Sequence, residues 1–140
     1  MKKLLAGGLL LVALGGLVLL SLPTILHKAG LHPTYSGPTL SLPGKRALII
    51  TTSHDVLAAP GVTEGEPTGV MASELTHPYY TFLDGGMDVD LASIQGGEIP
   101  IDPQTLRFMV KSPEDERYLN DKLAQAKVNN AIPIAGVDIG

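Results

Sequence analysis

Cysteine is absent from this 140-residue sequence, and charged residues are sparse. Without a thiol, these residues can form no disulfide, no thiolate metal site and no cysteine nucleophile. Charged side chains make up 17% of the chain, the net charge is −4, and the basic residues form no run longer than the pairs Lys2-Lys3 and Lys45-Arg46. A surface that binds a polyanion needs concentrated positive charge. The composition therefore argues against a nucleic-acid partner.

An uncharged apolar run, Leu4 to Leu22, occupies the N-terminus. A helix that rises about 1.5 Å per residue over this run would nearly cross a hydrocarbon core about 30 Å thick. Only a helix satisfies every backbone N–H and C=O group within its own segment, which a bilayer demands. We therefore expect one transmembrane helix in residues 1–28, with membrane lipid contacting residues 4–26.

A cleaved signal peptide is the alternative for this segment, since Met1-Lys2-Lys3 followed by an apolar stretch begins many of them. The run exceeds the roughly 7–15 apolar residues of a signal core, and no small-x-small cleavage pattern follows it. A retained single-pass anchor is therefore favoured. The two lysines before the span favour a cytoplasmic N-terminus, which places the soluble domain on the outer, periplasmic or extracellular side. Cleavage would instead give a secreted protein.

Residues 29–44 are rich in proline and glycine and predict an extended linker between membrane and domain. His27 and His32 lie at or near its start. A metal site needs further ligands at a defined spacing, so we expect no metal here and interpret both histidines as interfacial residues.

The domain of residues 45–140 opens on a continuous aliphatic run, Ala47 to Thr52, which is typical of a strand buried on both faces. We expect this strand to be central in a parallel sheet. It leads into Ser53, His54 and Asp55, and ligands gather at the carboxyl ends of such strands. These three are therefore candidate site-lining residues. The alternative, a polar turn in which Asp55 caps local backbone, is favoured by the spacing alone.

A loop is expected over residues 58–68, and an amphipathic helix from Val70 to Asp84. The helix carries one apolar stripe, made of Met71, Leu75, Tyr79, Phe82 and Leu83. Glu74 lies at the border of that stripe, where its carboxylate would be partly desolvated, although periodicity alone favours a surface glutamate. Pro78 lacks the N–H that the Glu74 carbonyl would accept, which predicts a kink or restart.

The remaining segments complete an α/β pattern. Gly85-Gly86 ends the helix, and the alternating Met87–Ser93 predicts a strand nearer the sheet edge. Residues 94–110 indicate turns, and Ser112-Pro113 followed by acidic residues predicts a helix start, with the helix running to about Lys127. Residues 128–134 would lead into another strand. A strand–helix–strand unit implies a parallel pair joined by a right-handed crossover.

Three sequence segments resemble the DJ-1/PfpI superfamily of class I glutamine-amidotransferase-like proteins, and within it the Hsp31-like group. They are residues 46–53, residues 68–80, and residues 89–93 together with Gly96-Gly97 and residues 100–103. The resemblance implies the N-terminal part of a flavodoxin-like parallel-sheet sandwich with a nucleophilic cysteine on a strand-to-helix elbow. It also implies that Glu74 is the acid that hydrogen-bonds the thiol and takes part in proton transfer. Activities described in the family are glyoxalase III-type lactate formation, deglycation, amidase or peptidase-like hydrolysis and holding chaperone function.

This sequence departs from the family at the nucleophile, because the cysteine and its following histidine would lie beyond Gly140 in the family's order. We therefore expect a partial, membrane-anchored domain that is inactive alone, whose parent acts on a small reactive aldehyde or an amide-like bond. The alternative is a non-catalytic tethered module that pairs its open sheet edge with another chain, for example in a homodimer. No cofactor is expected. Nucleotide or flavin binding ranks last because no Gly-x-Gly-x-x-Gly follows the first strand.

Overall fold

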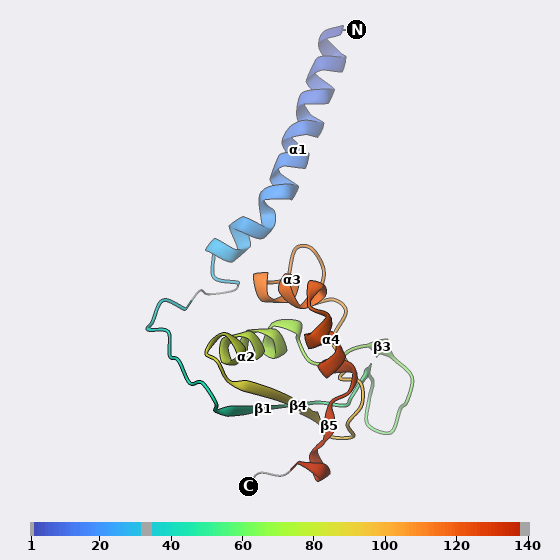
Figure 1. Ribbon diagram of the computed structural model, residues 1–140. Helices are drawn as coiled ribbons and strands as arrows, with labels where there is room; N and C mark the ends of the chain where they lie inside the picture. The colour runs from blue at the N-terminus through green and yellow to red at the C-terminus, as the bar shows by residue number, and fades with distance from the viewer. Residues whose placement is uncertain (1, 32–34, 138–140) are drawn as a thin grey trace. The chain divides into compact units, whose positions relative to one another are not determined.

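The computed structural model describes residues 2–31 and 35–137, which form two compact units (Figure 1). One contains the N-terminal helix and includes Phe108–Val110, and the other is the α/β unit. The helices are α1 (Lys2–Lys28), α2 (Ala72–Asp84), α3 (Pro113–Asn120) and α4 (Lys122–Asn129), with a 3₁₀ turn at Ile134–Gly136. The strands are β1 (Arg46–Thr51), β2 (Val56–Leu57), β3 (Glu66–Pro67), β4 (Asp88–Ser93) and β5 (Ile132–Pro133).

The apolar N-terminal run is helical, as predicted. Within α1 the stretch Gly7–Lys28 has a mean hydropathy of 2.5 and is long and apolar enough to cross a membrane. A signal sequence has the same properties, so length and composition leave both interpretations in place. His27 lies in the last turn of α1, and His32 lies outside the described residues.

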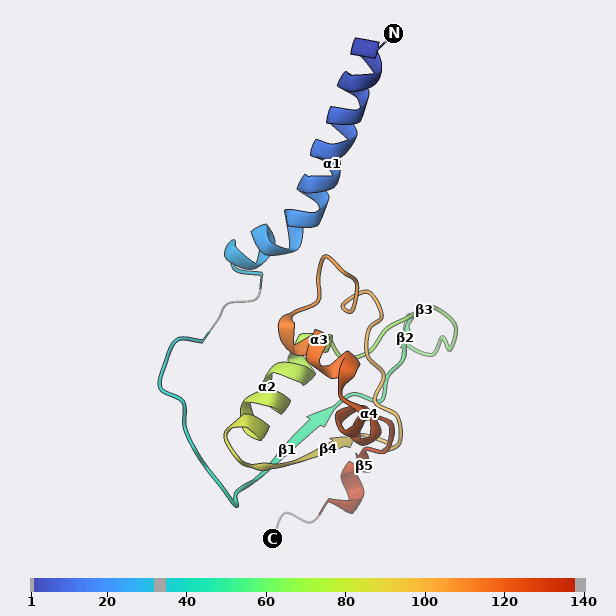
Figure 2. The same ribbon diagram turned by 45° about the horizontal axis from the view of Figure 1, so that its top comes forward.

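The sheet is parallel and three-stranded in the order β1-β4-β5. Helices α2 and α4 cover one face, as the two views in Figures 1 and 2 show. Their apolar side chains meet those of β4 in a single core, which consists of Leu75, Tyr79, Tyr80, Val89, Leu91, Ile99, Ala124, Val128 and Ala131. A second, two-stranded antiparallel ribbon pairs β2 with β3 and encloses the predicted loop. The α/β class is therefore confirmed.

The predicted strand order is wrong. Among the described residues β4 is the central strand and β1 lies at the edge, the reverse of the expectation. The alternating pattern of β4 indicated a wet face, yet Ala92 on that face is fully buried between its paired neighbours Ile50 and Ile132. The apolar run of β1 is only half-buried, and Ile50 remains 52% exposed. The hydrophobic pattern of a strand indicates whether one or both of its faces are buried. It does not indicate which strands pair with it, because those partners are distant in sequence.

Helix α2 begins at Ala72, and Gly85 and Gly86 end it as predicted. Gly86 adopts a φ of 84°, a conformation that residues with a Cβ rarely adopt. The helix continues through Pro78 without a break, so it does not restart there, and the kink that was predicted as the other outcome stays a prediction. Tyr80 is buried, although the predicted stripe omitted it, and Leu83 of that stripe is partly exposed.

The predicted helix from Ser112 to Lys127 is in fact two helices, α3 and α4, which divide at Asp121. The predicted start is confirmed: the Ser112 hydroxyl accepts from the Asp115 N–H while the Asp115 carboxylate accepts from the Ser112 N–H, a reciprocal capping box. At the division, the Asp121 carboxylate accepts from the N–H groups of Leu123 and Ala124 and thereby caps α4. The predicted final strand is present as β5.

Candidate functional site

The loops at the carboxyl ends of the strands are joined by hydrogen bonds into one cluster. Residues 52–55 follow β1, residues 94–105 follow β4, and residues 68–71 lead into α2. A crossover helix in a parallel unit starts near the edge at which the preceding strand ends. We refer to these three segments, together with Glu74 in the first turn of α2, as the carboxyl-edge loops.

Ser53 connects the first of these segments to the second, because its hydroxyl oxygen accepts a hydrogen bond from the Gln95 N–H at 2.9 Å. Asp55 connects the first to the third, since its carbonyl accepts from the Thr68 N–H at 2.9 Å. The N–H of His54 donates to the Thr52 hydroxyl, and the side chains of His54 and Asp55 are exposed. The predicted location at a strand end is therefore confirmed. The predicted cap is not, because the Asp55 side chain accepts no local backbone hydrogen bond in the described structure.

The segment before α2 lies directly against the loop after β4. Val70 forms a parallel bridge with Ile101: its N–H donates to the Pro100 carbonyl at 2.9 Å, and its carbonyl accepts from Asp102 at 3.0 Å. The neighbouring Gly69 has no room for a side chain, because a Cβ there would lie 2.2 Å from the Pro100 carbonyl oxygen. This close backbone contact fixes where α2 begins.

Thr105 caps the first turn of α2 from outside the helix. Its hydroxyl oxygen accepts from the Ala72 N–H at 3.0 Å and donates to the Asp102 carbonyl at 2.6 Å. The N-cap residue of α2, Met71, has no side chain that can accept a hydrogen bond, so Thr105 supplies the missing acceptor. The helix start is therefore held by a residue of a distant loop.

Glu74 lies in the first turn of α2, and its side chain is exposed rather than half-buried. Within the described part of the chain its carboxylate has no hydrogen-bond or ion-pair partner. A first-turn carboxylate is favoured by the positive end of the helix dipole, which is a structural reason for a glutamate here. Its free oxygens also remain available to a group brought to the carboxyl edge of the sheet.

The carboxyl-edge loops thus hold the His54 imidazole and the carboxylates of Asp55, Glu74 and Glu98 in exposed positions, on backbone that several hydrogen bonds fix. Such groups can accept or donate protons, and a serine hydroxyl oxygen lies beside them. Over residues 2–31 and 35–137, no cluster of three or more histidine, aspartate or glutamate side chains is arranged to hold a metal ion.

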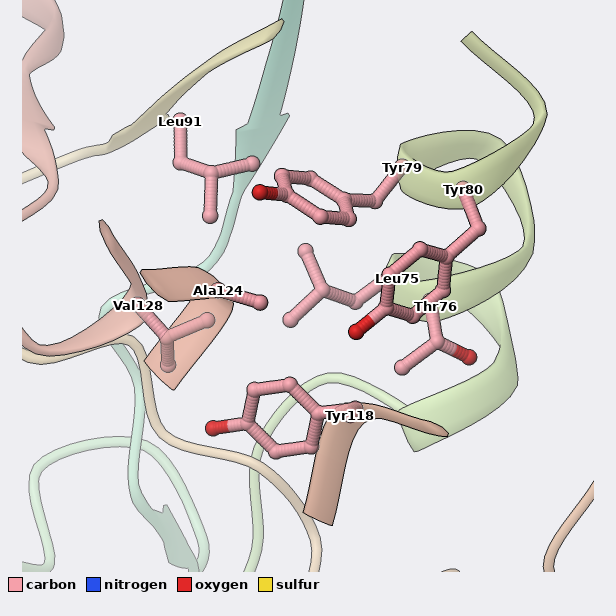
Figure 3. Close-up of a pocket in the computed structure, with 8 residues that line it drawn as sticks. All are labelled: Leu75, Thr76, Tyr79, Tyr80, Leu91, Tyr118, Ala124 and Val128. Atoms are coloured by element: carbon pink, nitrogen blue, oxygen red, sulfur yellow. The ribbon is translucent and has the colours of Figure 1, made fainter. Parts of the chain in front are cut away.

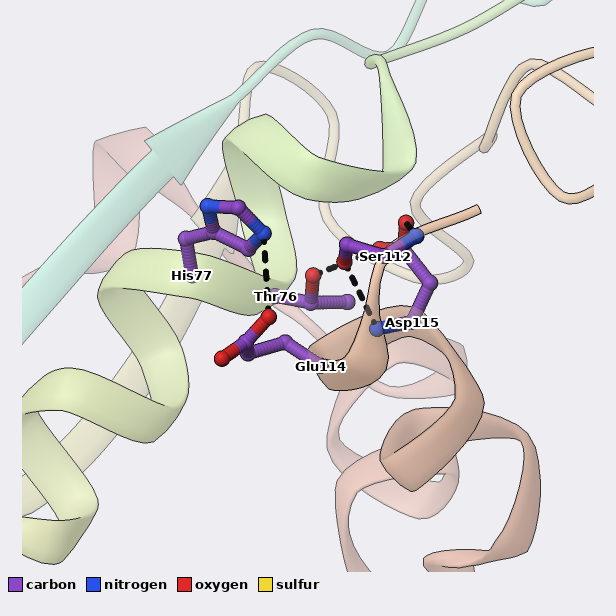
Figure 4. A network of polar contacts seen from close by, with 5 residues as sticks. All are labelled: Thr76, His77, Ser112, Glu114 and Asp115. Carbon is purple, nitrogen blue, oxygen red and sulfur yellow. Dashed lines mark hydrogen bonds and ion pairs between the residues drawn. The ribbon is translucent and has the colours of Figure 1, made fainter. Parts of the chain in front are cut away.

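A second polar cluster joins α2 to α3 (Figure 4). The Thr76 hydroxyl donates to the buried Asp115 carboxylate at 2.6 Å, and that carboxylate also belongs to the capping box with Ser112. Nearby, the His77 Nε2 lies 3.2 Å from a Glu114 carboxylate oxygen. The buried side chains of Thr76, Ser112 and Asp115 all take part in hydrogen bonds, which is typical of a structural network.

A third cluster lies around Tyr80 at the far end of α2. The Arg117 guanidinium stacks 4.0 Å from the centre of the Tyr80 ring and donates two hydrogen bonds to Asp84 at 2.7 and 2.9 Å. These hydrogen bonds lower the pKa of Asp84, whereas burial and the Asp121 carboxylate raise the pKa of Tyr80. Both terminal nitrogens of the Arg117 guanidinium therefore donate to Asp84 within the protein.

The core beneath α2 encloses a gap of about 10 Å³, lined mainly by apolar side chains (Figure 3). A gap of this size is at the lower limit for one water molecule and far too small for a substrate. It is a packing gap between the rings of Tyr79, Tyr80 and Tyr118 and the aliphatic residues around them.

The sequence predicted that the site lies at the carboxyl edge of the sheet. It did not predict two contacts that hold this edge together, the Thr105 cap on α2 and the contact between Gly69 and Pro100. The Asp102-Pro103 pair signals a turn, yet nothing in the local sequence indicates that the next threonine caps a helix 33 positions earlier. The predicted site residues Ser53 and Asp55 share the edge with the start of α2, while no hydrogen bond or ion pair joins them to the Glu74 side chain in the described residues.

The α/β unit defines the class of this protein: a parallel three-stranded sheet with helices packed on one face, preceded in sequence by one apolar helix. No protein-family profile and no curated protein matches the chain. The X-ray structure of Francisella tularensis Rapid Encystment Protein 24 kDa (REP24) is similar over 68% of this chain, at 38% sequence identity and a TM-score of 0.57. The match covers 40% of REP24, so this chain spans less than half of that protein's length.

A crystal structure named APC35852 is similar over 63% of this chain and 34% of its own length, at 32% identity. Its TM-score of 0.46 is too low to indicate a shared fold.

Proposed function

We propose that this chain is the N-terminal part of a membrane-anchored DJ-1/PfpI-like protein of the Hsp31-like group, in which Glu74 handles a proton at the carboxyl edge of a flavodoxin-like sheet. The observation that carries the proposal is the exposed Glu74 carboxylate on a helix start fixed by Gly69 and Thr105. A carboxylate without an internal partner, on rigid backbone, can form a hydrogen bond to a reacting group that another segment supplies.

The similarity to REP24 supports the fold part of this proposal, because 38% identity accompanies a TM-score above 0.5. REP24's name refers to rapid encystment and states no reaction, so the chemistry rests on the sequence resemblance. That resemblance favours a reactive aldehyde, or an amide-like bond, as the substrate of the complete protein. The chain has no cysteine, so a thiol nucleophile must come from residues other than these 140.

The N-terminal helix would anchor the protein by one span, with the α/β unit on the outer side of the membrane. The absence of charge within the apolar run supports the span, and the lysine pair before it supports this orientation. The anchor is tested by expressing the full chain and extracting membranes with alkaline carbonate. A retained anchor keeps the chain in the pellet at its full mass, whereas a cleaved signal releases a shorter soluble product.

The catalytic proposal is tested first on the nucleotide sequence that follows codon 140. A reading frame that continues into an Ala-x-Cys-His-Gly-like turn supports it, whereas a stop codon combined with a compactly folded 140-residue chain contradicts it. The extended and 140-residue proteins are then compared for conversion of methylglyoxal to lactate. We expect turnover by the extended protein alone, since the nucleophile is essential.

Replacement of the carboxylate then tests Glu74 itself. Glu74→Gln in the extended protein should lower kcat about 100-fold or more, the usual contribution of a general acid or base. Glu66→Gln is the matched control, because Glu66 is an exposed glutamate in β3 of the same unit. Equal activity of the two variants would remove Glu74 from the mechanism.

A non-catalytic, membrane-tethered interaction module is the second candidate, favoured by the β1 edge. Among the described residues β1 pairs on one side only, and Ile50 on it is exposed. An unpaired, apolar edge strand is a template for another chain. The size of the full chain in detergent separates this candidate from a self-contained unit, since a strictly monomeric, well-folded species would leave the edge without a function.

A further inference from the structure

Two helices of the α/β unit carry an acidic residue at their third helical position, and the two carboxylates are used in opposite ways. In α3 this residue is Asp115, whose carboxylate accepts a hydrogen bond from the N–H of the N-cap residue Ser112 at 2.7 Å. In α2 the N-cap residue is Met71 and the third helical residue is Glu74. Asp115 is buried within its capping box, whereas the Glu74 side chain is exposed and caps nothing among the described residues.

The difference follows from the source of the cap on α2. The first N–H groups of a helix have no partners within it, and an acidic residue at the third position commonly folds back to accept from them. In α2 the acceptor comes from another loop, because the Thr105 hydroxyl accepts from the Ala72 N–H at 3.0 Å. Ala72 is fully buried, so its N–H would otherwise lack both water and a partner. Thr105 therefore satisfies a donor that would otherwise require Glu74.

The Thr105 hydroxyl is held in the orientation that this cap needs. It donates its proton to the Asp102 carbonyl at 2.6 Å, which leaves its oxygen to accept from Ala72. The Thr105 N–H donates to the same carbonyl at 3.0 Å, and the Asp102 N–H donates to the Val70 carbonyl at 3.0 Å. The loop that carries the cap is thus bonded to the segment that leads into α2.

We propose that Thr105 is a positioning residue for Glu74. By capping α2 in place of Glu74, the Thr105 hydroxyl leaves the Glu74 carboxylate free to exchange a proton with a group at the carboxyl edge of the sheet. Without this hydroxyl, the Glu74 carboxylate folds back onto the first turn of α2, as Asp115 does in α3. A carboxylate folded back onto its own helix no longer reaches a reacting group. This inference rests on the proposed function of Glu74.

The cap is tested first on the full 140-residue chain in a mild detergent. Thr105→Val removes the hydroxyl and keeps the side-chain shape, whereas Thr105→Ser keeps the hydroxyl. Hydrogen exchange of the Ala72 amide should be about fivefold faster in T105V, the effect of losing one N-cap hydrogen bond, and unchanged in T105S. Thr81→Val is the matched control, because Thr81 is exposed on the same helix. Unchanged exchange in T105V would overturn the inference.

The same chain tests whether Glu74 takes over the cap. Glu74→Ala should lower the urea midpoint more in the T105V background than in the natural sequence, because the carboxylate becomes a cap only when the hydroxyl is gone. The interaction of Glu74 with the helix dipole is lost in both backgrounds, so it cancels in the comparison. Equal shifts in the two backgrounds would contradict the substitution of one cap by the other.

The consequence for proton transfer is measured in the extended protein, with methylglyoxal as the probe. T105V should lower kcat by about 10- to 100-fold with little change in KM, since the substrate still binds but the carboxylate is misplaced. T105S should restore kcat. Combined with Glu74→Gln, T105V should cause no further loss, because its effect passes through the carboxylate that is already absent.

The outcomes separate the two proposals. Full activity of E74Q refutes the proposed function and the positioning role with it. An inactive E74Q beside a fully active T105V refutes the positioning role alone. A T105V substitution that lowers the residual activity of E74Q by the same factor as that of the natural sequence indicates general damage and refutes it too. Thr105→Ala is the second variant if T105V does not fold, and misfolding of both would make the hydroxyl a requirement of the fold, which overturns the specific role.

Discussion

The Tyr80 hydroxyl donates a hydrogen bond to the Asp121 carboxylate at 3.2 Å, and Asp121 is the residue at which the C-terminal helical segment divides. The same carboxylate caps α4 by accepting from Leu123 and Ala124, each at 3.0 Å. Asp121 thus caps the end of α3 through its backbone N–H, while its side chain caps the start of α4 and accepts a hydrogen bond from Tyr80 of α2.

Removal of this carboxylate should destabilise the α/β unit. Asp121→Ala deletes the cap of α4 and the acceptor of Tyr80, which together should lower the free energy of unfolding by about 2 kcal/mol. Asp121→Asn keeps an acceptor oxygen and should cost less than half as much. Urea unfolding of the full chain in a mild detergent, followed by circular dichroism, measures both. Equal losses for the two variants would contradict the capping role.

Asp115 should be still more sensitive, since it is 1% exposed and serves two partners at once. Asp115→Ala leaves the Thr76 hydroxyl and the Ser112 N–H without acceptors in a buried position, which should cost about 2–4 kcal/mol. Thr76→Val removes only one of these hydrogen bonds and keeps the side-chain shape, so its cost should be about 1 kcal/mol. The same urea titration compares them. A larger effect of T76V than of D115A would show that the carboxylate is not the centre of the network.

The predictions from sequence succeeded where the signal was local. Ser112-Pro113 followed by acidic residues predicted a capped helix start, and Gly85-Gly86 predicted a helix end, because caps depend on residues within one turn. The division at Asp121 was missed, since an aspartate in a helical pattern is ordinarily a surface residue. Asp121 caps α4 locally and also accepts from Tyr80, 41 positions away, a partner that periodicity cannot reveal.

The strand order failed for a similar reason. The continuous apolar run of β1 indicated a central strand, and the alternation of β4 indicated an edge strand, yet burial along β4 is set by its pairing on both sides. The location of the site was easier to predict, because residues after a parallel strand fall at its carboxyl edge whatever the order. The role of Glu74 in proton transfer is a proposal that rests on the sequence resemblance.

The ion pair between Arg117 and Asp84 makes a pH-dependent contribution to the free energy of unfolding. The two hydrogen bonds from Arg117 lower the pKa of Asp84 below that of the unfolded chain, which is about 3.9. A group with a lowered pKa in the folded state adds stability above its unfolded pKa and loses that contribution as the pH falls through its folded pKa. Both side chains are about half exposed, so the contribution should be below about 1 kcal/mol.

A double-mutant cycle at two pH values checks this sign. Asp84→Asn and Arg117→Lys, alone and together, should show a coupling energy near neutral pH that declines as the pH falls through the lowered pKa of the folded-state Asp84 carboxyl group. The stacking of Arg117 on Tyr80 does not titrate in this range, so its loss in R117K should be independent of pH. A coupling energy that grows on acidification would contradict the assignment.

Gly69 should be the least replaceable glycine at the carboxyl edge. A methyl group there would lie 2.2 Å from the Pro100 carbonyl oxygen and 2.8 Å from the Ile101 nitrogen, and backbone atoms cannot move aside as the end of a flexible side chain can. Gly69→Ala should therefore push apart the two segments joined by the bridge between Val70 and Ile101, at a cost of about 1–3 kcal/mol. Gly136→Ala is the matched control, because its added Cβ would meet only the Pro133 side chain at an ordinary 3.7 Å. Hydrogen exchange should report faster exchange of the Val70 and Asp102 amides in G69A, with little change in G136A. Unchanged exchange in G69A would mean that α2 keeps its start without this close contact, and that the rigid placement of Glu74 has some other origin.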